Sequence, residues 1–350
     1  MSRARARASL ALLFLVVLCG TGDGQAASVG GWLKITSTGG RCAHGDPYAF
    51  WFHRGSPTKL LLFFQGGGGC WSFATCAPGS TFYRAYLQSP TSPPLPEGGI
   101  IDFSDPRNPF RNYSIAFLAY CTGDVHWGNH VQTYGDGRGH RLVIRHVGFD
   151  NDRRALAWVF ARFPAPTTVF VTGCSAGSVG SAVFAPYVIR SYPDAIVNQL
   201  GDSLALVLPR KLDIRSGWRG DRALPAWIPA MRRLNPARMT LADYYVALAN
   251  FYPGHTFAQF DHEGDWVQAR YYVALGGRWE AFPGALARTL QSIHDRARTF
   301  RSYVAGGDGH CVLPEASFYS LHVAGTPLRE WVADLAEGRP VANVAPSIHQ

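Results

Sequence analysis

Short, almost continuously apolar runs recur along the chain and predict the strands of a sheet. Their hydrophobic residues do not alternate with polar ones, which is typical of strands covered on both faces, as in a parallel sheet. The predicted strands span residues 48–53, 59–65, 114–120, 167–173, 195–201 and 301–307.

Segments between these runs carry apolar residues at helical spacing and predict helices over residues 149–164, 179–193 and 283–299. Strands that alternate with helices indicate an α/β fold with a mostly parallel central sheet flanked by helices. The stretch from about 204 to 255 is rich in Trp, Pro, Arg and Tyr, and predicts a helical, cap-like insertion. We expect a single domain over residues 28–350, because 47% hydrophobic residues suffice for one large core.

The N-terminal segment differs from the rest of the chain. Residues 1–27 hold three arginines, then an apolar run, then small residues, which is the pattern of a secretory signal peptide cleaved near Ala26 or Ala27. The apolar run is short for a membrane span, and no later segment is predicted to be transmembrane. We therefore expect a secreted or periplasmic protein with no stable membrane insertion after signal removal.

An exported chain meets oxidising conditions, so its cysteines are candidates for disulfides. Six remain after residue 27, and six cysteines allow 15 pairings. Cys70 and Cys76 lie close together in sequence and are the pair that we favour. The cysteines and histidines show no zinc-binding spacing, so we expect neither a metal nor another cofactor.

The formal net charge is +9, and three of the arginines belong to the predicted signal peptide. An ordinary basic surface accounts for this charge, and attraction to an acidic polysaccharide is the alternative. An exported chain with no basic run after the signal is not expected to bind nucleic acid.

The segment Gly173-Cys174-Ser175-Ala176-Gly177 has the form Gly-x-Ser-x-Gly and lies between a predicted strand and a predicted helix. In that position the pattern predicts a nucleophile elbow, a sharp turn that lifts the serine oxygen into a cleft above the sheet. The backbone N–H of Ala176 would then point at the oxyanion that forms on an attacked carbonyl.

Four glycines, Gly66 to Gly69, follow the predicted strand 59–65. Glycines let the backbone approach a substrate closely and turn its amides inward, so this loop is the expected source of a second oxyanion donor. A phosphate-binding loop is disfavoured because Cys70 and Trp71, and no lysine, come next.

A serine nucleophile needs a histidine base and a carboxylate that orients it. His310 is the best candidate, because it lies in a Gly-rich loop just after the last predicted strand. For the acid we favour Asp265, and Asp261 and Asp202 remain open alternatives. Asp213 also lies between the serine and the histidine.

Three separated motifs resemble those of the pectin acetylesterase family, which includes the Notum-type carboxylesterases. They are FFQGGGGCW, VTGCSAGS and the Asp-x-x-Gln pattern that begins at Asp265, and the histidine in DGHC fits as well. The segment AYCTGDVHWG (119–128) is also similar to a family segment. This resemblance implies an α/β-hydrolase fold, a Ser175–His310–Asp265 triad, and Gly68 and Gly69 as oxyanion donors beside Ala176.

The resemblance further implies hydrolysis of O-acyl esters, often acetyl groups on polysaccharide, so the expected substrate is an acylated small molecule or polysaccharide. Trp71 and Trp127 are the expected substrate-binding aromatics. Two alternatives stay open: a carboxylesterase for another ester (a polyester, a lipid or an acylated protein), or a non-catalytic carbohydrate-binding protein on a hydrolase fold.

Overall fold

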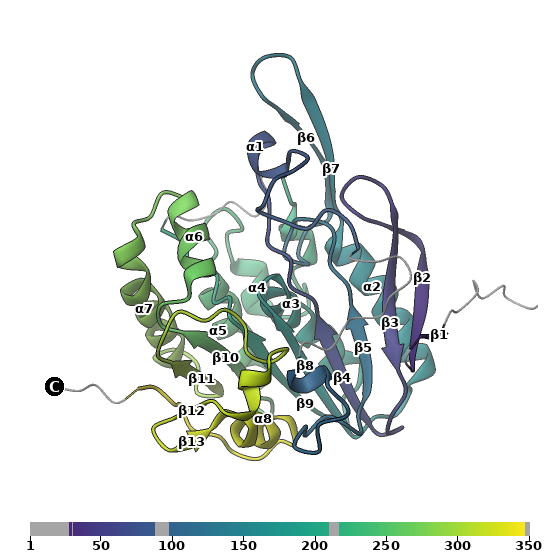
Figure 1. Ribbon diagram of the computed structural model, residues 1–350, viewed down its shortest axis with the longest axis vertical. Helices are drawn as coiled ribbons and strands as arrows, with labels where there is room; N and C mark the ends of the chain where they lie inside the picture. Colours follow the sequence, from purple (N-terminus) through teal and green to yellow (C-terminus); the bar gives the residue numbers. More distant parts are fainter. Residues whose placement is uncertain (1–27, 30, 88–97, 210–216, 347–350) are drawn as a thin grey trace, which may run out of the picture.

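The computed structural model describes residues 28–29, 31–87, 98–209 and 217–346 (Figure 1). The signal peptide predicted for residues 1–27 lies outside these residues. In the described part of the chain, no helix is long and apolar enough to cross a membrane.

One sheet of nine strands forms the centre of the fold (Figure 1). In spatial order the strands are β1 (Ser28–Val29), β2 (Trp32–Arg41), β3 (Pro47–His53), β5 (Ser114–Leu118), β4 (Lys59–Phe64), β8 (Thr168–Cys174), β9 (Ile196–Asp202), β10 (Phe257–His262) and β11 (Phe300–Ala305). From β5 to β11 all neighbours pair in parallel, whereas β1, β2 and β3 pair antiparallel at one edge. The mostly parallel sheet expected from the sequence is therefore confirmed.

All six strands predicted from apolar runs are present, but β1, β2 and β10 of the central sheet were missed. Strand β10 reads FAQFDH, and its buried positions include Gln259 and Asp261. Polar residues in a buried strand break the apolar run on which the prediction relied. Both side chains take part in hydrogen bonds close to the site described below.

Helices cover both faces of the sheet (Figure 1). The α-helices of the described residues are α1 (Phe73–Cys76), which lies beside the β6–β7 hairpin described below, α2 (Gly148–Arg162), α3 (Ala176–Ser191), α4 (Pro229–Arg233), α5 (Leu241–Phe251), α6 (Trp266–Ala274), α7 (Phe282–His294) and α8 (Leu328–Ala336). Neighbouring residues of β9 show the two faces, because side chains alternate along a strand. Asn198 donates to the Leu335 carbonyl of α8, whereas Gln199 donates to the Ser181 hydroxyl of α3.

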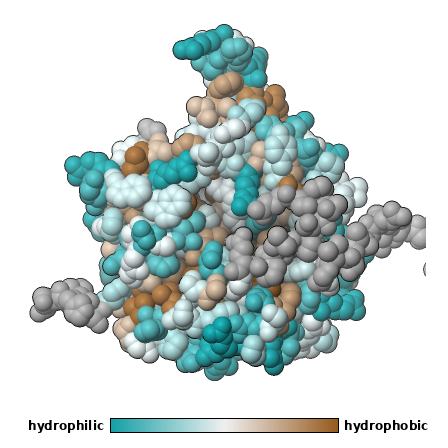
Figure 2. Space-filling model, viewed as in Figure 1, coloured by the Kyte–Doolittle hydropathy of each residue, from teal (hydrophilic) through white to brown (hydrophobic). Residues whose placement is uncertain are grey.

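A hairpin of β6 (His130–Gly135) and β7 (Arg141–His146) protrudes from the body of the molecule (Figure 1). A second, very short pair is formed by β12 (His322–Val323) and β13 (Thr326–Pro327). The end of the β6–β7 hairpin is hydrophilic, and hydrophobic residues gather nearer its base (Figure 2). Val131 and Val143 are exposed on it.

The cap-like insertion predicted over 204–255 divides into parts with different positions. Helix α5 begins with a Thr240 capping box and packs beside α7 and against β10 and β11, so it belongs to the layer that covers the sheet. Leu204, Leu206, Val207, Leu208 and Trp218 line the cleft described below. Residues 210–216 lie outside the described part of the chain, and the cap-like insertion stays a prediction.

Close contact between α3 and β4 depends on Gly177. A Cβ built there would lie 1.9 Å from the Phe64 carbonyl oxygen, a backbone atom that cannot move away alone. We predict that Gly177→Ala lowers the free energy of unfolding by at least about 2 kcal/mol, because an overpacked site must shift the strand or the helix.

The matched control is Gly254→Ala, since a Cβ at this exposed position meets no atom within 4 Å. Chemical denaturation of both variants measures the difference. The control should stay within about 0.5 kcal/mol of the parent, and equal stability of the two variants would contradict this account of the packing.

Candidate active site

Ser175 lies at the sharp turn between β8 and α3. Its backbone has φ 57° and ψ −120°, and a positive φ is costly for a residue with a side chain. Glycines on both sides make the turn possible: a Cβ at Gly173 would lie 2.5 Å from the Gly177 carbonyl oxygen. The turn has the strand–serine–helix form that Gly-x-Ser-x-Gly predicts.

His310 and Asp265 come together from two loops at the same end of the sheet. The imidazole Nδ1 lies 2.8 Å from Asp265 Oδ2 and 3.0 Å from Oδ1. Carboxylate oxygens accept, so Nδ1 carries the proton and Nε2 is left for the cleft. Asp265 is fully buried, and the His310 side chain is 15% exposed.

The Asp265 carboxylate is itself held in place as the N-cap of α6. Its Oδ1 accepts hydrogen bonds from the backbone N–H groups of Val267 and Gln268, at 2.9 and 3.0 Å. The Gln268 side chain adds a third donor, with Nε2 3.0 Å from Oδ2. These donors fix the orientation of the carboxylate toward His310.

The other two carboxylates considered from the sequence have different partners. Asp202 Oδ2 accepts the backbone N–H groups of Val312 and Leu313, at 2.9 and 2.8 Å, and burial raises the pKa of this carboxyl to about 6. Asp261 Oδ1 accepts from Gln268 Nε2 at 2.7 Å, and burial raises its pKa well above the usual range. Asp213 lies outside the described residues. The structure therefore brings Asp265, of the three described carboxylates, to the imidazole.

A disulfide joins the two halves of this site. Cys174, the residue before Ser175, is bonded to Cys311, the residue after His310. Cys42 is bonded to Cys121, and the predicted Cys70–Cys76 bridge is confirmed. Because the Cys174–Cys311 bridge spans 137 residues, it also restricts the unfolded chain strongly.

Ser175 and His310 both line one cleft. Most of its wall is apolar: Val125, Leu204, Leu206, Val207, Leu208, Trp218, Val267 and Leu275. Gly68, Gly69, Trp71, Ala176, Gln268 and Tyr271 complete the lining. The cavity volume is about 50 Å³, which is space for roughly three to five water molecules.

The four-glycine loop lies directly against the serine turn. A Cβ on Gly66 would lie 2.8 Å from the Cys174 carbonyl oxygen and 3.1 Å from Ser175 Cβ, so only glycine allows this approach. Gly68 and Ala176 line the cleft, as expected for oxyanion donors. Gly69 is a correction, because its N–H donates to the Phe82 carbonyl at 3.0 Å and is not free for a substrate.

The two tryptophans predicted to bind substrate have different environments. Trp71 lines the cleft and packs edge-on against Phe82, with ring centres 5.5 Å apart. Trp127 is only 1% exposed and packs against Tyr244 of α5, so its assignment as a substrate-binding residue was wrong. Its side chain is part of the hydrophobic core.

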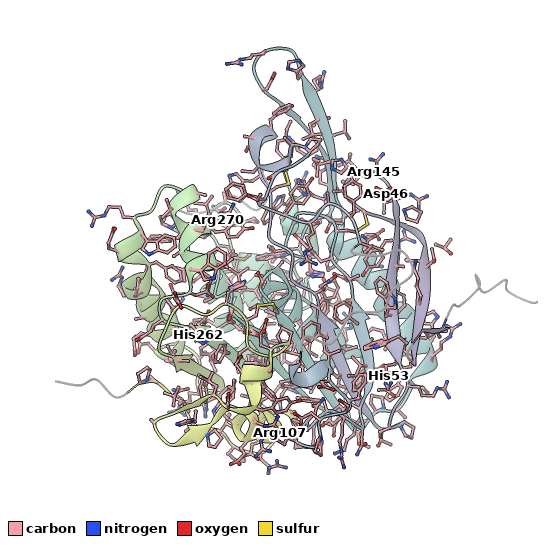
Figure 3. All side chains as sticks on the ribbon, in the orientation of Figure 1. Asp46, His53, Arg107, Arg145, His262 and Arg270 are labelled. Atoms are coloured by element: carbon pink, nitrogen blue, oxygen red, sulfur yellow. A yellow bond between two sulfur atoms is a disulfide. The ribbon has the colours of Figure 1, made fainter. Side chains whose placement is uncertain are left out.

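Sequence reasoning missed the residues of α6 that form one wall of the cleft. Tyr271 lines the cleft, and its hydroxyl donates to the Phe82 carbonyl. Arg270, labelled in Figure 3, lies with its guanidinium 4.9 Å from the Phe82 ring centre and donates to Thr81. The Asp-x-x-Gln pattern marked Gln268 without giving it a role. Its contacts with Asp265, Asp261 and the Ala205 N–H were not predictable from the pattern.

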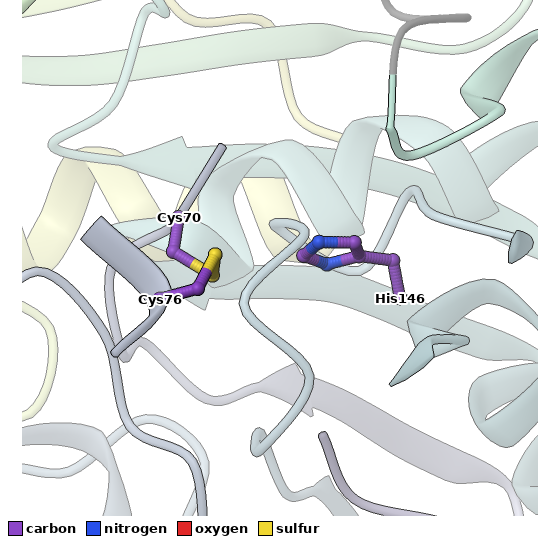
Figure 4. Close-up of side chains that lie close together, drawn as sticks. All are labelled: Cys70, Cys76 and His146. Carbon is purple, nitrogen blue, oxygen red and sulfur yellow. A yellow bond between two sulfur atoms is a disulfide. The ribbon is translucent and has the colours of Figure 1, made fainter. Parts of the chain in front are cut away.

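Cys70, Cys76 and His146 form a compact group whose potential ligand atoms lie within 4.8 Å of one another (Figure 4). The two sulfurs are bonded to each other, which removes them as thiolate ligands. Both nitrogens of His146 are also engaged: Nδ1 donates to the Thr122 carbonyl and Nε2 accepts from the Tyr134 hydroxyl, each at 3.0 Å. Burial lowers the pKa of His146 to about 3. The group fits a packed structural cluster better than a metal site.

Comparison with known proteins gives a consistent result. The model of the pectinacetylesterase family matches residues 32–207. Inactive palmitoleoyl-protein carboxylesterase notum1b of Danio rerio is 34% identical over 107 residues, which cover 29% of this chain and 75% of that protein. The solved structure of the Wnt deacylase Notum from Drosophila superposes with a TM-score of 0.64 at 17% identity, covering 90% of this chain and 96% of that one. This likeness supports the α/β-hydrolase fold.

Two substitutions separate Asp265 from Asp202 as the partner of the imidazole. We predict that Asp265→Asn lowers kcat by about 10³- to 10⁴-fold, because an amide at this position favours the wrong tautomer of His310. Asparagine still caps α6, so the fold should persist. Asp202→Asn should keep kcat within about threefold, since an amide oxygen can accept the same two backbone N–H groups.

The pH dependence of stability gives a second readout. A raised pKa means that Asp202 holds its proton more tightly in the folded protein than in the unfolded chain. Its contribution to the free energy of unfolding is therefore greatest below about pH 4 and is lost as the pH rises through 6. The stability of Asp202→Asn relative to the parent should therefore rise by about 3 kcal/mol between pH 4 and pH 8.

Loss of turnover in Asp202→Asn, with turnover retained in Asp265→Asn, would reverse the assignment of the imidazole's partner.

Proposed function

The chain belongs to the pectinacetylesterase family, and from this premise we propose that it is an exported serine esterase that hydrolyses acyl esters. One observation carries the proposal: the buried Asp265 carboxylate is hydrogen-bonded to His310, and His310 lines the same cleft as the strained Ser175. Export is supported by the predicted signal peptide and by the three disulfides.

The proposed reaction has two halves. His310 Nε2 takes the proton of the Ser175 hydroxyl as its oxygen attacks the ester carbonyl, and the N–H groups of Gly68 and Ala176 hold the developing oxyanion. The protonated imidazole, stabilised by Asp265, then gives its proton to the departing alcohol. Water, activated by His310, next releases the acyl group from Ser175.

The apolar wall of the cleft supports the longer of two classes of acyl group. Resemblance alone favoured acetyl esters on polysaccharide, for which a shallow polar groove would be suitable. Leu204, Leu206 and Leu208 line one cavity with Val125 and Trp218. Burial of each additional methylene in such a cavity contributes about 0.8 kcal/mol. We therefore propose a substrate with an acyl chain longer than acetyl.

If the protein only bound carbohydrate, its cleft would not need a complete set of catalytic residues. One relative is named as inactive. This chain has a serine at the turn, a histidine in the loop after β11, and a carboxylate hydrogen-bonded to that histidine. These three residues support catalysis rather than carbohydrate binding alone.

Kinetics with p-nitrophenyl esters test the proposal. We predict that kcat/KM rises from acetate to butyrate and hexanoate, because each methylene adds apolar contact. Acetylated pectin and xylan should be poorer substrates. Ser175→Ala should lose activity by about 10⁵-fold or more, whereas Ser181→Ala, in the helix α3 that follows the turn, should retain it.

Two results would overturn parts of this proposal. Full turnover by folded Ser175→Ala would remove the nucleophile. A preference for acetate over every longer ester, with efficient release of acetate from pectin, would leave the serine esterase intact and return the substrate to acetylated polysaccharide.

A further inference from the structure

The loop Gly66–Gly69 carries no side chains that could fix its own conformation. Glycine adopts both signs of φ at little cost, so each peptide group of such a loop is free to rotate. An oxyanion hole requires the opposite property, because its N–H groups stabilise the transition state only if they are oriented beforehand. Some other part of the protein must therefore hold these peptide groups.

Each peptide group is planar, and its C=O points away from the N–H of the next residue. A hydrogen bond to one carbonyl therefore also orients the following amide. Three carbonyls are held in this way. The Arg84 N–H lies 2.8 Å from Gly67 O and orients the Gly68 amide, the expected oxyanion donor, while the Tyr120 hydroxyl lies 2.7 Å from Gly68 O and fixes the peptide group on the other side of Gly68. His126 Nε2 lies 2.8 Å from Gln65 O and fixes the peptide group that enters the loop. Two of the three donors are side chains.

Tyr120 acts on the loop with both its ring and its hydroxyl. A Cβ on Gly67 would lie 2.3 Å from Tyr120 Cδ1, so the ring occupies the space beside that glycine. The hydroxyl donates to Gly68 O and accepts the Val125 N–H at 2.8 Å. Tyr120 is 1% exposed and fully enclosed, which leaves this hydroxyl no water to replace either partner.

His126 donates to the carbonyl before the loop and is itself held by Asp152. A carbonyl only accepts, so Nε2 carries a hydrogen and donates to Gln65 O. Nδ1 lies 2.6 Å from Asp152 Oδ2, and the Tyr48 hydroxyl donates to the other oxygen of Asp152 at 3.2 Å. The rings of His126 and Tyr120 are 4.8 Å apart, so the two residues form one packed unit.

Resting on the serine-esterase function proposed above, we propose that Tyr120 and His126 are positioning residues that preorganise the Gly66–Gly69 oxyanion loop. Val125, which precedes His126 and donates its N–H to the Tyr120 hydroxyl, lines the cleft. Tyr120 and His126 are not among the lining residues, and they donate to the carbonyls of Gly68 and Gln65. This assigns a role to the segment 119–128, whose sequence stood out without a function.

Tyr120→Phe tests the hydroxyl, because it keeps the ring that packs on Gly67. We expect kcat for p-nitrophenyl butyrate to fall by about tenfold to a hundredfold, with KM within about threefold, since the loss concerns transition-state stabilisation. Affinity for an alkyl boronic acid, which places an anionic oxygen in the same hole, should fall by a similar factor.

Tyr192→Phe is the matched control. Its hydroxyl is also buried and donates to a backbone carbonyl, that of Phe163 at 2.8 Å, but it lies outside the cleft lining. Tyr120→Phe loses two buried hydrogen bonds and Tyr192→Phe loses one, so both melting temperatures should fall, that of Tyr120→Phe by more. Only Tyr120→Phe should change kcat.

A pair of variants at His126 gives an independent readout if Tyr120→Phe does not fold. His126→Gln places its amide near the position of Nε2 and can still donate to Gln65 O, whereas His126→Asn reaches only toward Asp152. We expect His126→Gln to keep at least about ten times the kcat of His126→Asn.

Unchanged kcat and boronate affinity in folded Tyr120→Phe would overturn the inference, as would equal kcat in the two His126 variants. A kcat loss in Tyr192→Phe as large as in Tyr120→Phe would also overturn it, because stability alone would then explain both. These outcomes assume an active parent protein. If the parent neither hydrolyses esters nor reacts with a fluorophosphonate at Ser175, the proposed function itself fails.

Discussion

The strained turn at Ser175 is the constraint on which the arrangement of this site depends. A residue with a side chain is held at φ 57° between β8 and α3, a conformation that persists only where the surrounding structure enforces it. Here the enforcement is close packing: Gly177 sits against the Phe64 carbonyl, and Gly66 sits against Cys174 and Ser175. The same contacts that impose the turn bring the oxyanion loop next to the nucleophile.

The histidine loop is tied to this turn by two kinds of bond. Cys174–Cys311 links it covalently. Asp202 links it through hydrogen bonds, because its backbone carbonyl accepts from the Ser175 N–H at 2.7 Å while its carboxylate accepts from Val312 and Leu313. Burying an ionisable group for this purpose is costly, as its raised pKa shows. Asp202 therefore aligns the nucleophile turn with the base through bonds to the residues beside His310.

Sequence patterns predicted the features that depend on residues close together in the chain. The Gly-x-Ser-x-Gly turn and the six apolar strands depend on neighbouring residues, and both are present. Asp265 could be favoured but not separated from Asp261 and Asp202, because all three lie on or after parallel strands near the same end of the sheet. The difference between them is set by Val267 and Gln268, which cap the carboxylate only after α6 has formed.

The errors concern partners that are remote in sequence. Gly69 could not be excluded as an oxyanion donor without knowing that the Phe82 carbonyl accepts its N–H. Trp127 could not be recognised as a core residue without the position of Tyr244 in α5.

The most direct measurement of the central claim is a crystal structure of the protein after reaction with an alkyl fluorophosphonate. The account predicts phosphorus bonded to Ser175 Oγ, and a phosphonyl oxygen about 2.7–3.1 Å from the N atoms of Gly68 and Ala176. A phosphonyl oxygen turned away from both amides, or an adduct on another residue, would contradict it.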